Sequence, residues 1–155
     1  MTNFKLLFLM SIIVSVIIVG CEEKEDTTPT PTTYTNKMTA KVNGVDYVAT
    51  TITGKAITGA IYLRAEKGNN TIALNLDFFQ ATGTFTMSSN MYPIGFYTAD
   101  GEDVYCDTGT VIISTHDEEN NVIKGTFNFT TKPSGNTTIY KITEGAFDIK
   151  YTTPY

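Results

Sequence analysis

Apolar and polar residues alternate with a period of two over much of the chain after residue 37, and this pattern constrains the fold more than any other feature. Clear examples lie at 38–42, 45–49, 72–78 and 147–151. Successive side chains of a strand point to opposite faces of its sheet, so the alternation predicts strands with one face on a core. No window carries a 3.6-residue apolar period over three turns, which predicts little or no helix here.

Turn signals separate these predicted strands. Asn43-Gly44 is a strong hairpin signal, because both residues tolerate a positive φ. Residues 67–70 (KGNN) indicate a second hairpin, and a third has its predicted turn within residues 116–121 (HDEENN). In addition, Gly residues at 83, 109, 125 and 145 each stand two positions before a large apolar side chain. Glycine at a strand start or bulge lets a sheet bend sharply.

These features together predict the fold class. We expect an all-β domain, an antiparallel β-sandwich or a barrel-like sheet of about nine to eleven short strands. The glycine spacings are irregular, so the pattern is not that of a solenoid or propeller repeat.

The N-terminus carries a signal of a different kind. Lys5 precedes an apolar run at residues 6–19, which ends in Gly20-Cys21. The run is shorter than the roughly 18–20 residues that cross a bilayer as a helix, and its length is typical of a secretory signal peptide. A cysteine directly after the small residue predicts lipoprotein processing, with acyl chains such as palmitate on Cys21. A plain secretory signal and a short membrane anchor are the alternatives.

The anchor predicts a location. One acyl chain binds a membrane reversibly and two or more bind it stably, so a lipidated Cys21 would hold the protein on the membrane. Lys24-Glu25-Asp26 resembles the export signal of surface lipoproteins of Bacteroidota. That resemblance implies display on the outer face of the outer membrane. The alternative is a solvated, charged start to a linker.

The remaining sequence divides into a tether and one domain. Residues 21–36 contain the acidic run and a Thr/Pro-rich stretch that we expect to be extended and solvated. Residues 37–155 have the size of a single domain. Removal of residues 1–20 removes Lys5 and no acid, so 10 basic and 16 acidic residues remain and the formal net charge is −6. This charge, without any basic cluster, disfavours nucleic acid as a partner.

Several segments resemble an uncharacterised lipoprotein family of Bacteroidota. In that family an opening Asn-Gly hairpin, a Gly-Thr-Phe strand and a closing Gly-x-Phe strand recur, and here they match residues 38–47, 109–114, 123–129 and 142–151. The resemblance covers most of the predicted domain and implies a β-rich surface domain. It implies no catalytic or binding residues.

The sequence offers little for catalysis, metals or cofactors. The single histidine, His116, falls in the predicted polar turn of a hairpin, too exposed to orient a catalytic triad. Zinc needs several His and Cys ligands, and the acidic stretches at 100–103 and 117–121 match no EF-hand loop. Cys106 lacks a partner once Cys21 is lipidated, and we expect it to be buried as a small apolar residue. We therefore predict no catalytic residues, no metal, no cofactor and no enzymatic activity.

One stretch is a candidate ligand-binding site. Residues 90–107 (NMYPIGFYTADGEDVYCD) look like the least regular part of the domain. Aromatic and acidic side chains on a loop can bind sugars, peptides or cations. The alternative is that the rings close one end of the core. The candidate residues are Tyr92, Phe96, Tyr97, Asp100, Glu102, Asp103 and Tyr105.

Three functions remain open from the sequence. The first is a non-catalytic binding module for a glycan, a peptide or a partner protein, which predicts an exposed aromatic patch. The second is a structural or assembly component of the cell envelope, which predicts exposed sheet edges. The third is a lipocalin-like carrier of an apolar ligand, which predicts an open barrel interior.

Overall fold

The computed structural model describes residues 33–78, 81–132 and 138–154, and all regular structure in these ranges is β-strand. Cys21 and the tether up to residue 32 lie outside the described residues. No helix of the described part is long and apolar enough to cross a membrane. The ten strands are β1 (Lys37–Val42), β2 (Val45–Tyr47), β3 (Thr51–Ile57), β4 (Ala60–Lys67), β5 (Asn70–Asp77), β6 (Gly83–Met87), β7 (Ile94–Ala99), β8 (Glu102–Asp117), β9 (Val122–Thr131) and β10 (Lys141–Lys150).

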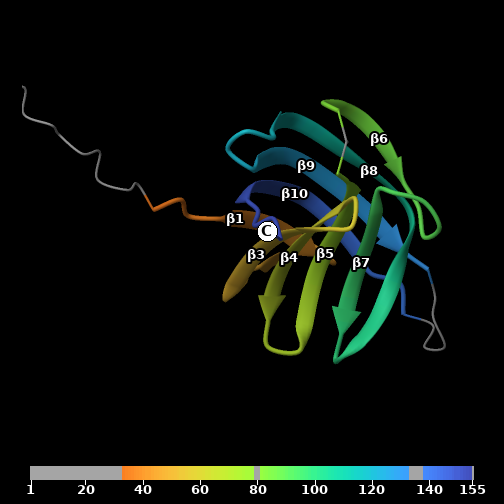
Figure 1. The fold of residues 1–155 in the computed structure, drawn as a ribbon. Helices are drawn as coiled ribbons and strands as arrows, with labels where there is room; N and C mark the ends of the chain where they lie inside the picture. The colour runs from red at the N-terminus through yellow and green to blue at the C-terminus, as the bar shows by residue number, and fades with distance from the viewer. Residues whose placement is uncertain (1–32, 79–80, 133–137, 155) are drawn as a thin grey trace, which may run out of the picture. The chain divides into compact units, whose positions relative to one another are not determined.

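The strands form one antiparallel sheet that curls into a half-barrel (Figure 1). Their order is β2-β1-β10-β9-β8-β7-β5-β4-β3, and β6 pairs with β8 outside this path. The 16-residue strand β8 joins the two halves, because residues 102–105 pair with β7 and residues 106–117 pair with β9. The prediction of an all-β antiparallel fold is confirmed.

All three predicted hairpins lie where the sequence placed them. Asn43 and Gly44 have φ values of 51° and 81°, as a two-residue hairpin turn requires, and they connect β1 to β2. Gly68, with φ 59°, turns the chain between β4 and β5. The third turn is shorter than expected: His116 and Asp117 still belong to β8, where they pair with Ile123 and Val122 of β9.

Three of the four glycines that precede large apolar residues in the sequence have a clear structural role. Gly109, Gly125 and Gly145 each lie opposite a phenylalanine of the neighbouring strand: Phe129, Phe147 and Phe127, respectively. A Cβ at any of the three positions would come within 2.8 Å of both that phenylalanine and a backbone oxygen. The register of the pairing also shifts within a few residues of these positions. The glycines therefore make room for aromatic rings and allow the curvature that the sequence predicted.

The inner faces of the curled sheet enclose a filled core. Large side chains with less than 2% exposure come from both halves, including Leu63, Leu74, Ile113 and Ile149. Cys106 is fully buried among them, as expected, and burial raises the pKa of its thiol to about 11. The thiol is therefore protonated and inert at neutral pH.

Strand β3, at one end of the sheet, meets the chain segment that follows β10. The backbone N–H of Ala56 donates to the Thr152 carbonyl (2.7 Å), and the Thr152 N–H donates to the Gly54 carbonyl (3.0 Å). Gly54 lies so close that a Cβ would be 2.5 Å from Cγ2 of Ile149. We call this meeting of β3 with Tyr151 and Thr152 the seam.

Candidate functional site

The stretch proposed from the sequence as an irregular binding loop is mostly a hairpin. Residues 94–99 form β7, Asp100 and Gly101 form its turn with φ values of 52° and 89°, and β8 begins at Glu102. The expectation of irregular structure was therefore wrong for this part. The alternation was hard to see because Ile94 and Phe96, on the outer face, are also apolar.

The alternation within β7 separates its two aromatic residues. Tyr97 points into the core, is 6% exposed, and packs on Tyr47 and Tyr140 with ring centroids 6.4 Å and 4.8 Å away. Phe96 points to the outer face, where its ring lies 5.7 Å from the ring of Tyr105 on β8. Phe96 is itself only 7% exposed, whereas Tyr105 is 45% exposed, so a ligand on the outer face would meet Tyr105 rather than Phe96 or Tyr97.

The acidic candidates lie around the β7–β8 turn. Asp103 accepts a hydrogen bond from the Thr98 hydroxyl (2.6 Å), and the backbone N–H of Asp100 donates to the side chain of Asn70 (3.0 Å). Glu102 is exposed. Across residues 33–78, 81–132 and 138–154, no three His, Cys, Asp or Glu side chains are grouped so that they could hold a metal ion.

An aromatic strip on the outer face comprises Tyr62 and Arg64 of β4, Tyr92 from the segment before β7, Phe96 of β7 and Tyr105 of β8. Arg64 pairs with Ala73 of β5, which pairs with Phe96 of β7. Because Ala73 has only a methyl group, the guanidinium of Arg64 reaches over β5 to lie 5.8 Å from the centre of the Phe96 ring. We call these five residues the aromatic strip.

Two rings of the strip are open to solvent. Tyr92 and Tyr105 are each 45% exposed. A hydrogen bond between Tyr92 and Tyr62 joins the segment before β7 to β4 and raises the pKa of Tyr92. These rings can stack on a sugar or an apolar side chain and donate a hydrogen bond from the hydroxyl.

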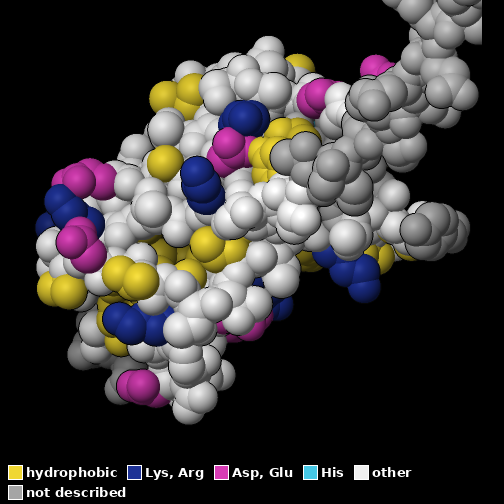
Figure 2. All heavy atoms as spheres, turned by 90° about the vertical axis from the view of Figure 1, so that its left-hand side faces the viewer, with side chains coloured by type: hydrophobic (Ala, Val, Ile, Leu, Met, Phe, Trp, Pro, Cys, Tyr) yellow, Lys and Arg dark blue, Asp and Glu magenta, His cyan; other side chains and the backbone are white. Residues whose placement is uncertain are grey.

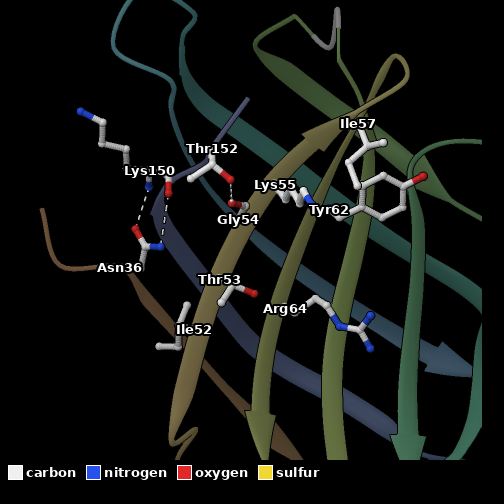
Figure 3. A pocket seen from close by; sticks show the side chains of 10 residues that line it. All are labelled: Asn36, Ile52, Thr53, Gly54, Lys55, Ile57, Tyr62, Arg64, Lys150 and Thr152. Carbon is white, nitrogen blue, oxygen red and sulfur yellow. Dashed lines mark hydrogen bonds between the residues drawn. The ribbon is translucent and has the colours of Figure 1, made fainter. Parts of the chain in front are cut away.

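A groove of about 540 Å³ continues the strip toward the seam. Tyr62, Arg64 and five residues of β3 line one side, and Asn36, Lys150 and Thr152 line the other, as Figure 3 shows. The side chain of Asn36 accepts from the Lys150 N–H (2.8 Å) and donates to the Lys150 carbonyl (3.3 Å). Asn36 therefore holds the backbone of Lys150 in place within the same wall of the groove.

The charge of the groove is opposite to that of the protein. Lys55, Arg64 and Lys150 line it without any acidic residue, whereas the whole chain has a formal net charge of −5. Arg64 has an acidic neighbour, Glu66, at 3.7 Å, but both side chains are 44% exposed, so the pair is weak. Figure 2 shows basic and acidic side chains interspersed on this side of the molecule, with hydrophobic ones visible between them.

Sequence reasoning missed the groove because its walls are distant in the chain. Lys55 and Lys150 come together only when the sheet curls and the segment after β10 reaches β3. One signal was available: Arg64 is the only arginine of the chain, at an outward position of a clearly alternating strand. An arginine at such a position is a candidate contact residue.

His116 lies in a different environment from the one expected. It is at the end of β8, and its Nε2 is 3.0 Å from the hydroxyl of the buried Tyr151. The ring of Phe78 stands edge-on to His116 at 6.4 Å. His116 is thus a half-buried packing residue rather than part of a solvated turn.

The fold and this site define a small, strand-built domain with a surface groove. Residues 34–149 match the domain of unknown function DUF6252, so the chain belongs to that family. Neither a curated protein nor a solved structure matches the chain significantly.

Proposed function

We propose that this protein is a membrane-anchored lipoprotein, displayed on the surface of a bacterium of the Bacteroidota, whose domain binds a ligand without catalysing a reaction. The anchor rests on Gly20-Cys21 behind the apolar run, and surface display rests on the acidic residues that follow. One structural observation carries the binding role: the cation-lined groove continues into the exposed aromatic strip on one outer face.

The chemistry of this face favours binding. A groove of a few hundred Å³ is typical of a ligand site, and exposed tyrosines with an arginine are the side chains that most often dominate binding interfaces. Tyr92 and Tyr105 are each 45% exposed and lie outside the core cluster. Their position beside the groove would let them contact a ligand bound there.

An assembly role in the cell envelope is the second candidate. Strand β2 ends the sheet opposite to β3, and Val45 and Val48 near it are 71% and 69% exposed. Exposed apolar residues at a sheet edge suit pairing with another protein. A carrier role is disfavoured, because buried side chains from both halves fill the described interior.

The binding role can be tested by NMR on the full chain in detergent micelles. Titration with a panel of neutral and acidic glycans and of peptides should shift signals of Tyr62, Arg64 and Tyr105. Arg64→Ala and Tyr105→Ala should weaken any such binding, whereas Ile112→Ala, exposed on the other half of the sheet, should not. A panel that shifts no signal on this face would refute the proposed site.

The anchor has its own test. Cys21→Ala should move the protein from the membrane fraction to a soluble one, because the acyl chains supply the membrane affinity. Retention of the Cys21→Ala protein in the membrane fraction would contradict lipidation. Protease treatment of intact cells should degrade the wild-type domain if it is on the surface.

A further inference from the structure

We infer that the groove binds an extended acidic peptide segment, which adds as a strand to the open part of the β3 edge. The inference rests on the proposed binding function and names the ligand class of the same site. It depends on two observations: the backbone groups that β3 leaves unpaired and the charge of the side chains around them.

The direction of the backbone groups on β3 follows from the seam. Because the Gly54 carbonyl accepts from Thr152, Gly54 faces away from β4. Residues of an edge strand alternate in this respect, so Ile52 also directs its N–H and C=O away from β4. The Gly54 N–H points the same way as its carbonyl.

These groups have no partner in the described structure. Thr152 covers only the Gly54 carbonyl and the Ala56 N–H. A continuation of this pairing would place Lys150 opposite Ile52 and Gly54, but the backbone N–H and C=O of Lys150 bond to Asn36 instead. The seam therefore opens next to Ile52, and the groove occupies the opening.

Only a polypeptide supplies N–H and C=O groups at the spacing of a strand, so the unpaired edge favours a peptide over a glycan. The charges that line the groove then determine which side chains the bound peptide should carry. Lys55 and Lys150 are exposed, and no ion pair involves either of them among the described residues. Acidic residues at alternate positions of the added strand would face these cations and Arg64, while the residues between them would face Ile52.

The experiment measures fluorescence anisotropy of a labelled synthetic peptide in which glutamate alternates with valine, added to the full chain in detergent micelles. We expect saturable binding that weakens with salt, because exposed ion pairs are screened. The same peptide with lysine in place of glutamate should not bind. Equal binding of both peptides would overturn the inference.

Charge reversal locates the site. The double variant Lys55→Glu with Lys150→Glu should weaken binding about tenfold or more, because two attractive contacts become repulsive. The control is Lys141→Glu, another exposed position, at the other end of β10 and about 30 Å from Lys150 along the strand, well beyond the screening length. Equal effects of the double variant and the control would refute binding in this groove.

N-methylation of the peptide tests strand addition itself. Methyl groups on alternate amides block one hydrogen-bonding edge of a strand and leave the other free. Of two peptides methylated in opposite phase, one should bind and the other should not. Equal binding of the two would exclude pairing with β3 and overturn the inference.

The remaining outcomes separate this inference from the proposed function. If no acidic peptide binds but a glycan shifts signals of the same groove, the ligand class is wrong and the binding function stands. If analytical ultracentrifugation shows self-association that Lys55→Glu abolishes, the occupant is a second copy and the inference fails. If no ligand acts on this face, both proposals fail.

Discussion

The close approach of Gly54 to the segment after β10 gives the most informative stability prediction. A Cβ at Gly54 would lie 2.5 Å from Cγ2 of Ile149 and 3.0 Å and 3.1 Å from Cβ and Cα of Tyr151. Carbon atoms in contact are normally about 3.5–4.0 Å apart, so Gly54→Ala requires the segment to move by roughly 1 Å.

The expected cost has two parts. Overpacking of this kind typically costs about 1–3 kcal/mol. The shift also weakens the two backbone hydrogen bonds of Thr152 with Gly54 and Ala56, each worth about 0.5–1.5 kcal/mol. Because moving the segment relieves part of the overlap, we expect a loss of about 2–3 kcal/mol rather than the full sum. For a domain of this size that lowers Tm by roughly 6–12 °C.

The assay is thermal and urea unfolding of the full chain, followed by circular dichroism. Gly59→Ala is the matched control: φ at Gly59 is +80° and no atom lies within 4 Å of its added Cβ, so only backbone strain of about 1–2 kcal/mol is expected. Because the displaced segment widens the seam, peptide binding by the Gly54→Ala protein should also differ from that of the wild-type protein. Stability of Gly54→Ala equal to or above that of Gly59→Ala would refute the account of the seam.

Two further predictions concern titratable groups in the core. Burial raises the pKa of the Cys106 thiol to about 11. Iodoacetamide at pH 8 should therefore leave Cys106 unmodified in the native protein and alkylate it in urea, as measured by intact-mass spectrometry. Fast alkylation of the native protein would contradict the burial of Cys106. Burial likewise raises the pKa of Tyr47 to about 12, above the usual value near 10 of an unfolded chain. The stability that depends on Tyr47 is thus fully present below pH 10 and lost as the pH rises to about 12. Urea unfolding at pH 8, 10 and 11 should show this fall in the free energy of unfolding, and the fall should be smaller in Tyr47→Phe.

Local patterns were sufficient to predict most of the sheet. Asn43-Gly44 forms a turn for reasons contained in two residues, and the strands around it keep one face on the core. The turn of the third hairpin lies within its predicted range, but His116 and Asp117, polar residues that resemble a turn, belong to the end of β8. In the fold His116 pairs with Ile123 and contacts Tyr151, 35 positions away, and no local pattern encodes such a contact.

The β7–β8 hairpin was missed although part of its signal was present. Asp100-Gly101 is a typical hairpin turn pair, and both residues have positive φ. The strand before it has apolar residues on both faces, since the outer face carries the aromatic strip. The property that makes this face a candidate binding site is therefore the one that obscured its strand pattern.

The groove forms only when the sheet curls and the segment after β10 reaches β3. Its cations bear on two properties of the β3 edge: the binding of a ligand and self-association with another copy of the protein. An uncovered strand at the end of a sheet can pair with other copies of itself, and lysine at such an edge opposes that pairing. Two β3 edges brought together would place the cations Lys55, Arg64 and Lys150 of one copy against those of the other. The same charges would attract an acidic strand, so one arrangement would both limit self-association and select a partner. On the proposed function, the three cations around the open part of this edge have a role in an otherwise acidic protein.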